Sequence, residues 1–105
     1  MADRIKFNTI EEAVKDIKEG KIIIVVDDEN RENEGDFICS ADHINRDIVN
    51  FMAKEGRGLI CSPLSSGITE RLKLPLLPHE NSGKLETNFT VSVDYNHGTT
   101  TGISA

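Results

Sequence analysis

Carboxylate side chains are concentrated in one ten-residue segment, Asp27–Asp36, which reads DDENRENEGD and contains six acids and a single Arg. Carboxylates this close repel one another, so the segment costs free energy unless a cation or Arg31 neutralises it. Oxygen ligands in a loop favour Mg²⁺, Mn²⁺ or Ca²⁺ over zinc. The segment therefore predicts a site for a hard divalent cation, and a solvated acidic turn that binds no ligand is the alternative.

The spacing of the acids narrows the kind of site. An EF-hand loop with Gly35 at its glycine position would place Ala41 where a Glu is required, so the EF-hand pattern is excluded. Glu32, Glu34 and Asp36 instead occupy every second position, and in an extended backbone they project to one side. We therefore expect three carboxylates on one face.

Regular elements are expected on both sides of this segment. Thr9 and Glu12 have capping-box spacing and begin an amphipathic helix that Gly20 ends. The run Ile22–Val26 is apolar without alternation, which is typical of a central strand buried on both faces. The further elements that we expect are strands at Phe37–Ser40, Gly58–Ser62 and Phe89–Tyr95, a helix from the N-cap Asn45 to Gly56, a helix at Ser66–Leu74 and an exposed loop at Leu76–Glu86. This pattern predicts an α/β (α+β) fold with a mixed sheet covered by helices.

Composition excludes several classes of partner and location. The net charge is −6, and outside the acidic segment acids and bases nearly balance, so no basic face for nucleic acid is expected. The longest apolar run has five residues, far short of the about 20 that span a bilayer. The N-terminus has no apolar stretch of the secretory type. Cys39 and Cys61 lack C-x-x-C spacing, so we expect reduced thiols, a core position for Cys39 and a cytoplasmic protein.

The acidic segment, directly after an apolar strand, closely resembles the signature of the 3,4-dihydroxy-2-butanone 4-phosphate synthase family of riboflavin biosynthesis. The resemblance continues through Gly58–Cys61, Phe89–Asp94 and Gly98–Ala105. It implies a 3,4-dihydroxy-2-butanone 4-phosphate synthase-like fold in which residues 1–105 form the N-terminal part of a single domain. Later motifs of the family have no counterpart, so we expect this chain to be a fragment that is inactive, or nearly so, alone.

The resemblance also implies roles for individual residues. Glu32 matches the ligand of Mg²⁺ or Mn²⁺, and with Arg31 it matches the pair that contacts the sugar phosphate. Asp36 matches a further substrate-binding acid, and Glu34 is the candidate proton shuttle. The pocket-lining segments of the family match Cys61 and the run Thr99–Thr101, including Thr100. None of the three His residues matches the family's metal-binding His motif.

The implied activity is a lyase reaction that converts D-ribulose 5-phosphate to 3,4-dihydroxy-2-butanone 4-phosphate and formate. Hard-cation catalysis and crowded carboxyl groups suit its enolisation and proton transfers. The family also implies a homodimer. Two alternatives stay open: a non-catalytic metal-binding or interaction module that kept the acidic loop, and an unrelated α/β scaffold whose acidic turn is only solvated.

Overall fold

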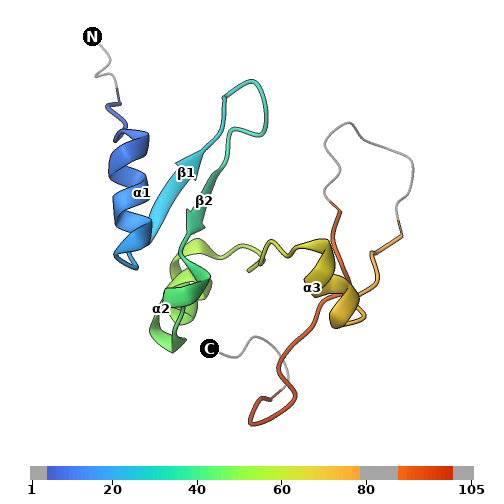
Figure 1. The fold of residues 1–105 in the computed structure, drawn as a ribbon. Coiled ribbons are helices and arrows are strands. Elements are labelled where there is room, and N and C mark those ends of the chain that lie inside the picture. The colour runs from blue at the N-terminus through green and yellow to red at the C-terminus, as the bar shows by residue number, and fades with distance from the viewer. Residues whose placement is uncertain (1–4, 79–87, 101–105) are drawn as a thin grey trace. The chain divides into compact units, whose positions relative to one another are not determined.

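The computed structural model describes residues 5–78 and 88–100, which belong to two compact units. The first unit extends to Ile60 and the second begins at Cys61. Figure 1 shows the elements along the chain. Among the described residues, no helix is long and apolar enough to cross a membrane.

Helix α1, Ile10–Lys18, has the predicted start and end. The Thr9 hydroxyl accepts a hydrogen bond from the Glu12 N–H, and the Glu12 carboxylate accepts one from the Thr9 N–H, both at 3.1 Å. After the helix, Gly20 has φ +80°, and a Cβ there would lie 2.7 Å from Cδ2 of His43. Glycine is therefore required by both the backbone conformation and the close approach of the imidazole ring.

An antiparallel hairpin follows α1, and α1 lies beside the first strand of this hairpin (Figure 1). Strands β1, Ile23–Val26, and β2, Gly35–Ile38, pair with Ile24 opposite Phe37. Strand β2 thus begins and ends two residues before the predicted range of Phe37–Ser40.

A short 3₁₀ turn η1, Ala41–His43, leads from the hairpin to helix α2, Arg46–Phe51. The Asn45 side chain caps α2 by accepting from the Ile48 N–H at 2.9 Å, as predicted. The helix continues as the π-helical turn η2, Met52–Gly56, and Arg57 ends it in the left-handed conformation. The Phe37 and Phe51 rings stack with centroids 5.4 Å apart, which joins the helical segment to β2.

The prediction that Ile22–Val26 is a central strand buried on both faces is wrong for the described residues. The exposed fractions are 65% for Ile24, 44% for Val25 and 47% for Val26, and no described residue is fully buried. Both strands of the described sheet are edges, because the sheet has two strands. A continuous apolar run indicates a strand that has to be covered, but the covering layer comes from other parts of a fold.

In the second unit, helix α3, Ser66–Arg71, begins after Ser65 and ends before the predicted Leu74. Lys73 there has φ 54°, a left-handed conformation that is incompatible with a continuing helix. Two predicted strands are absent: Gly58–Ser62 is irregular, and Phe89–Tyr95 contributes only an isolated bridge between Thr90 and Leu76. A strand needs a continuous ladder of backbone hydrogen bonds, and the pairing of Phe89–Val91 with Pro75–Leu77 stops after two of them, Leu77 N–H to the Phe89 carbonyl at 2.8 Å and Val91 N–H to the Pro75 carbonyl at 3.0 Å. The loop expected at Leu76–Glu86 lies mostly outside the described residues.

The combination of helices and a sheet that the sequence predicts is confirmed. Strand pairing among the described residues is antiparallel throughout.

Candidate active site

The acidic segment forms the connection between β1 and β2 and is ordered by the carboxylate of Asp27. This residue directly follows β1, and its two oxygens accept the backbone N–H groups of Glu32 and Glu34, each at 2.8 Å. Its own N–H donates to the Glu34 carbonyl at 3.2 Å, which extends the hairpin by one pair. The side chain of Asp27, at the start of the turn, thus binds the backbone at its end.

The tip of the connection is a second local turn around Asp28. The Asp28 carboxylate accepts from the Asn30 N–H at 2.7 Å, and its carbonyl accepts from the Arg31 N–H at 2.9 Å. Asn33 has φ 51°, a left-handed conformation that Asn tolerates better than most residues. These contacts reverse the chain within a few residues.

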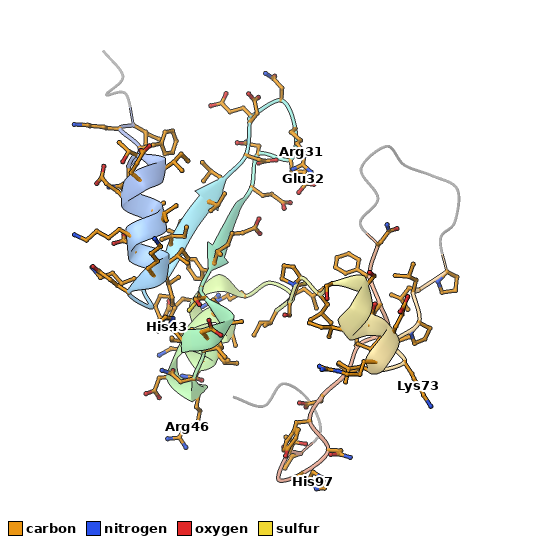
Figure 2. The ribbon with its side chains drawn as sticks, viewed as in Figure 1. Arg31, Glu32, His43, Arg46, Lys73 and His97 are labelled. Atoms are coloured by element: carbon orange, nitrogen blue, oxygen red, sulfur yellow. The ribbon has the colours of Figure 1, made fainter. Side chains whose placement is uncertain are left out.

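Arg31 lies between two carboxylates. Its Nη1 is 3.1 Å from Oδ2 of Asp27, and its Nη2 is 3.3 Å from Oε1 of Glu32. Figure 2 shows Arg31 and Glu32 next to each other on the connection. The exposed fractions of the side chains are 22% for Asp27, 38% for Glu32 and 55% for Arg31. Asp27 is therefore the inner member of the cluster, and the other two face solvent.

Hydrogen bonding also holds the pKa of Asp27 below its ordinary value. The N–H of Glu34 contributes most, followed by the N–H of Glu32, and the Arg31 guanidinium adds a smaller effect in the same direction. Each favours the charged form of the carboxyl group.

The predicted single face of carboxylates is not found. Glu32 lies in the turn, so the backbone from Glu32 to Asp36 is not continuously extended. Asp36 lies within β2 opposite Val25, in alternation with Phe37. Because neighbouring strand residues point to opposite faces, Asp36 lies on the face of the sheet away from the Phe37–Phe51 stack.

The donor atoms of this cluster agree with a hard cation in type but not in number. Glu32 offers a solvent-facing carboxylate, the ligand that Mg²⁺ and Mn²⁺ prefer. Within residues 5–78 and 88–100, no three His, Cys, Asp or Glu side chains come together as a metal site requires. The described residues therefore fit one ligand of such an ion, and the remaining ligands would be water or other side chains.

The other predicted site residues belong to the second unit. Cys61 is exposed, and the hydroxyl of Thr99 donates to the Tyr95 carbonyl at 2.5 Å. Thr100 is exposed, and Thr101 lies outside the described residues. Their participation in the site remains a prediction. In the first unit, Cys39 is half-buried.

Asp27 orders the turn, a role that the sequence did not predict, because Asp27 counted there only as one acid of the segment. The signal was present, because an Asp directly after a strand and a few residues before a second strand is a frequent organiser of turns through its side-chain oxygens. Only the fold shows that these oxygens reach the N–H of Glu34, seven residues away.

Comparison with known proteins gives a consistent result. Residues 11–105 match the family model described as 3,4-dihydroxy-2-butanone 4-phosphate synthase. Two curated relatives, each called riboflavin biosynthesis protein RibBA, are 55% identical over 104 residues (Cytophaga hutchinsonii) and 54% identical over 99 residues (Bacillus cereus). The matches cover 98% and 94% of this chain but 26% and 25% of the relatives, so the chain spans about a quarter of their length.

Two solved structures have the same fold. RibBX, a two-domain 3,4-dihydroxy-2-butanone 4-phosphate synthase from A. baumannii, is 45% identical with a TM-score of 0.76, and the match covers 92% of this chain and 28% of that one. A 3,4-dihydroxy-2-butanone 4-phosphate synthase in complex with two magnesium ions is 40% identical with a TM-score of 0.82. That match covers 93% of this chain and 46% of the other.

Proposed function

The chain belongs to the 3,4-dihydroxy-2-butanone 4-phosphate synthase family, and we propose that it contributes part of the active site that converts D-ribulose 5-phosphate to 3,4-dihydroxy-2-butanone 4-phosphate and formate. The observation that carries this proposal is the match of residues 11–105 to the family, with the ordered acidic connection inside it. The reaction removes one carbon from a five-carbon sugar phosphate as formate.

In this proposal the exposed pair at the connection binds the two charged partners. Glu32 supplies a carboxylate ligand to a divalent cation, Mg²⁺ or Mn²⁺, and Arg31 binds the substrate phosphate. When bound, such a cation acts as a Lewis acid toward enolates and vicinal diols. Both side chains face solvent, and the exposed ion pair between them, at 3.3 Å, is weak enough to be released when oppositely charged ligands bind.

Further residues are assigned by the same family pattern. Asp36 binds substrate, and Glu34 and Asp36 exchange protons with it. Cys61, Thr99 and Thr100 line the substrate pocket. We further propose a homodimer that works in the cytoplasm, with no nucleic acid or membrane as partner.

A chimaera tests this function. The chain replaces the 104 matched residues of the Cytophaga hutchinsonii relative, which supplies the rest of its own sequence. We expect the chimaera to release formate from D-ribulose 5-phosphate in the presence of Mg²⁺. Glu32→Gln in the chimaera should abolish this turnover while the circular dichroism spectrum is unchanged, because a neutral amide replaces a charged ligand. Glu11→Gln, which removes the same charge on α1, is the matched control.

Three outcomes contradict the proposal or part of it. A folded chimaera that binds Mn²⁺ without releasing formate favours the non-catalytic metal-binding module. A folded chimaera that does neither favours an acidic turn that is only solvated. Unchanged formate release by the Glu32→Gln variant removes Glu32 from the site.

A further inference from the structure

We propose that Asp27 is a positioning residue of this site: its carboxylate forms the turn that presents Arg31 and Glu32 together. The inference rests on the proposed function for its purpose, but its structural part concerns the hydrogen bonds of Asp27 alone. Asp27 does not touch the substrate in this assignment and acts through the backbone of its neighbours.

The first support is the number of groups that one carboxylate holds. Oδ1 of Asp27 accepts the Glu34 N–H, while Oδ2 accepts the Glu32 N–H and Nη1 of Arg31. These donors come from three residues that are four, five and seven positions further along the chain. Backbone and side chain at the site are therefore tied to the same two atoms.

The second support is that both oxygens of Asp27 are already used by donors. Glu32, by contrast, is more exposed, and of its carboxylate oxygens Oε1 lies against Arg31. A carboxylate that accepts three hydrogen bonds has little capacity left for a cation or a substrate proton, whereas Glu32 retains some. The geometry thus separates a residue that shapes the turn from residues that face the ligand.

The third support is that only a carboxylate meets this set of donors. In Asn, one of the two oxygens is replaced by an NH₂ group, which is itself a donor. That NH₂ group would face either the Glu34 N–H, which loses one hydrogen bond, or the Glu32 N–H and Arg31, which loses two. Asp27→Asn is therefore nearly isosteric but incompatible with the turn.

Amide hydrogen exchange on the 105-residue chain tests the structural part. In the parent chain we expect slowed exchange at the Glu32 and Glu34 N–H groups, and in Asp27→Asn we expect at least one of them to exchange about tenfold faster. Glu29→Gln removes the same charge from the same connection and should leave both rates unchanged. The Glu12 N–H, held by Thr9 in α1, is the internal reference for intact local structure. Equal rates in parent and Asp27→Asn overturn the proposal, whether both are slow or both are fast.

A second measurement separates this inference from the proposed function. Mn²⁺ is titrated into the chimaera and its Asp27→Asn and Glu29→Gln variants, and bound Mn²⁺ is followed by electron paramagnetic resonance. We expect the Asp27→Asn variant to bind Mn²⁺ about tenfold more weakly than the Glu29→Gln variant, since both lose one charge and only the first loses the turn. Equal affinities overturn the positioning role. Absence of Mn²⁺ binding in the parent chimaera contradicts the proposed function, while the exchange result still decides the hydrogen bonds of Asp27.

Discussion

Arg31 competes, at the scale of single residues, with any cation that approaches Glu32. Its Nη2 lies 3.3 Å from Oε1 of Glu32, and both side chains face solvent. Exposed ion pairs contribute about 0.2–1 kcal/mol, so releasing this one changes cation affinity only modestly. The same guanidinium is the proposed ligand of the substrate phosphate. Its removal should therefore strengthen cation binding and weaken substrate binding.

Arg31→Gln in the chimaera should therefore tighten Mn²⁺ binding by up to about fivefold and raise KM for D-ribulose 5-phosphate. Paramagnetic titration and initial rates of formate release measure the two effects. Arg46→Gln removes the same charge from the start of α2, away from the connection (Figure 2), and reports the general effect of net charge. Weaker Mn²⁺ binding in Arg31→Gln than in Arg46→Gln contradicts the competition.

Gly20 is the second position where one residue decides local structure. Gly20→Ala should destabilise the first unit by about 1–3 kcal/mol, because φ is +80° and the new Cβ would meet the His43 ring at 2.7 Å. Gly58→Ala is the control in the same unit, since nothing lies within 4 Å of its added Cβ. Urea unfolding followed by circular dichroism compares the two, and equal midpoints would refute the argument.

The capping box determines the start of α1 at the scale of elements. The Asn8 side chain donates to Oε2 of Glu12 at 3.0 Å and the Thr9 N–H donates to Oε1 at 3.1 Å. With the Thr9 hydroxyl as a third contact, these hydrogen bonds hold the pKa of Glu12 below its ordinary value of 4.5. A lowered pKa in the folded state stabilises the helix above the ordinary pKa, and this stabilisation is lost as the pH falls through the folded value.

The first turn of α1 should accordingly lose helicity on acidification between about pH 5 and pH 3. The Cα chemical shifts of Ile10, Glu11 and Glu12 measure this loss. In Glu12→Gln the amide oxygen still accepts from the Thr9 N–H, so its shifts should vary much less over the same range. An identical pH profile in both chains would show that another group controls the helix start.

The exposed apolar surface is the dominant property at the scale of the whole molecule. None of the described residues is fully buried, and large apolar side chains such as Ile24, Leu59 and Val93 are 65%, 75% and 68% exposed. Exposed apolar area of this kind favours association with other apolar surfaces. In the two solved relatives, the matched region makes up 46% of the synthase with two magnesium ions and 28% of RibBX.

The 105-residue chain should therefore bind the apolar dye ANS more strongly per molecule than the chimaera and release formate at least about tenfold more slowly. In the proposed site Glu32 is the one metal ligand from the described residues, which bring no three His, Cys, Asp or Glu side chains together, and a site without its other contacts loses orientation as well as affinity. Dye fluorescence and formate assays at equal protein concentration measure both. Formate release by the chain alone at the rate of the chimaera would refute this expectation.

Local signals in the sequence predicted local structure well. The starts of α1 and α2 follow from Thr9 and Asn45, because a capping side chain binds a backbone N–H three residues away. The acidic connection was recognised for a similar reason, since its composition and its place after an apolar strand are visible without the fold. The role of Asp27 was not predicted from the sequence, because one of its oxygens binds an N–H seven residues away across a turn that contains a left-handed Asn33.

The sequence by itself thus determined the family, from motifs along the whole chain, and it determined the helix starts, the β1–β2 region and the acidic segment from residues close together in the chain. Only the tertiary structure decided which carboxylate is internal, which apolar residues are covered and which runs become strands. Gly58–Ser62 and Phe89–Tyr95 have strand-like patterns. A strand forms only when its backbone pairs with another segment, and the residues of the run itself do not specify that segment. Whether β1 is buried is likewise decided outside the strand, because a strand is covered by the elements that pack on it and not by its own residues.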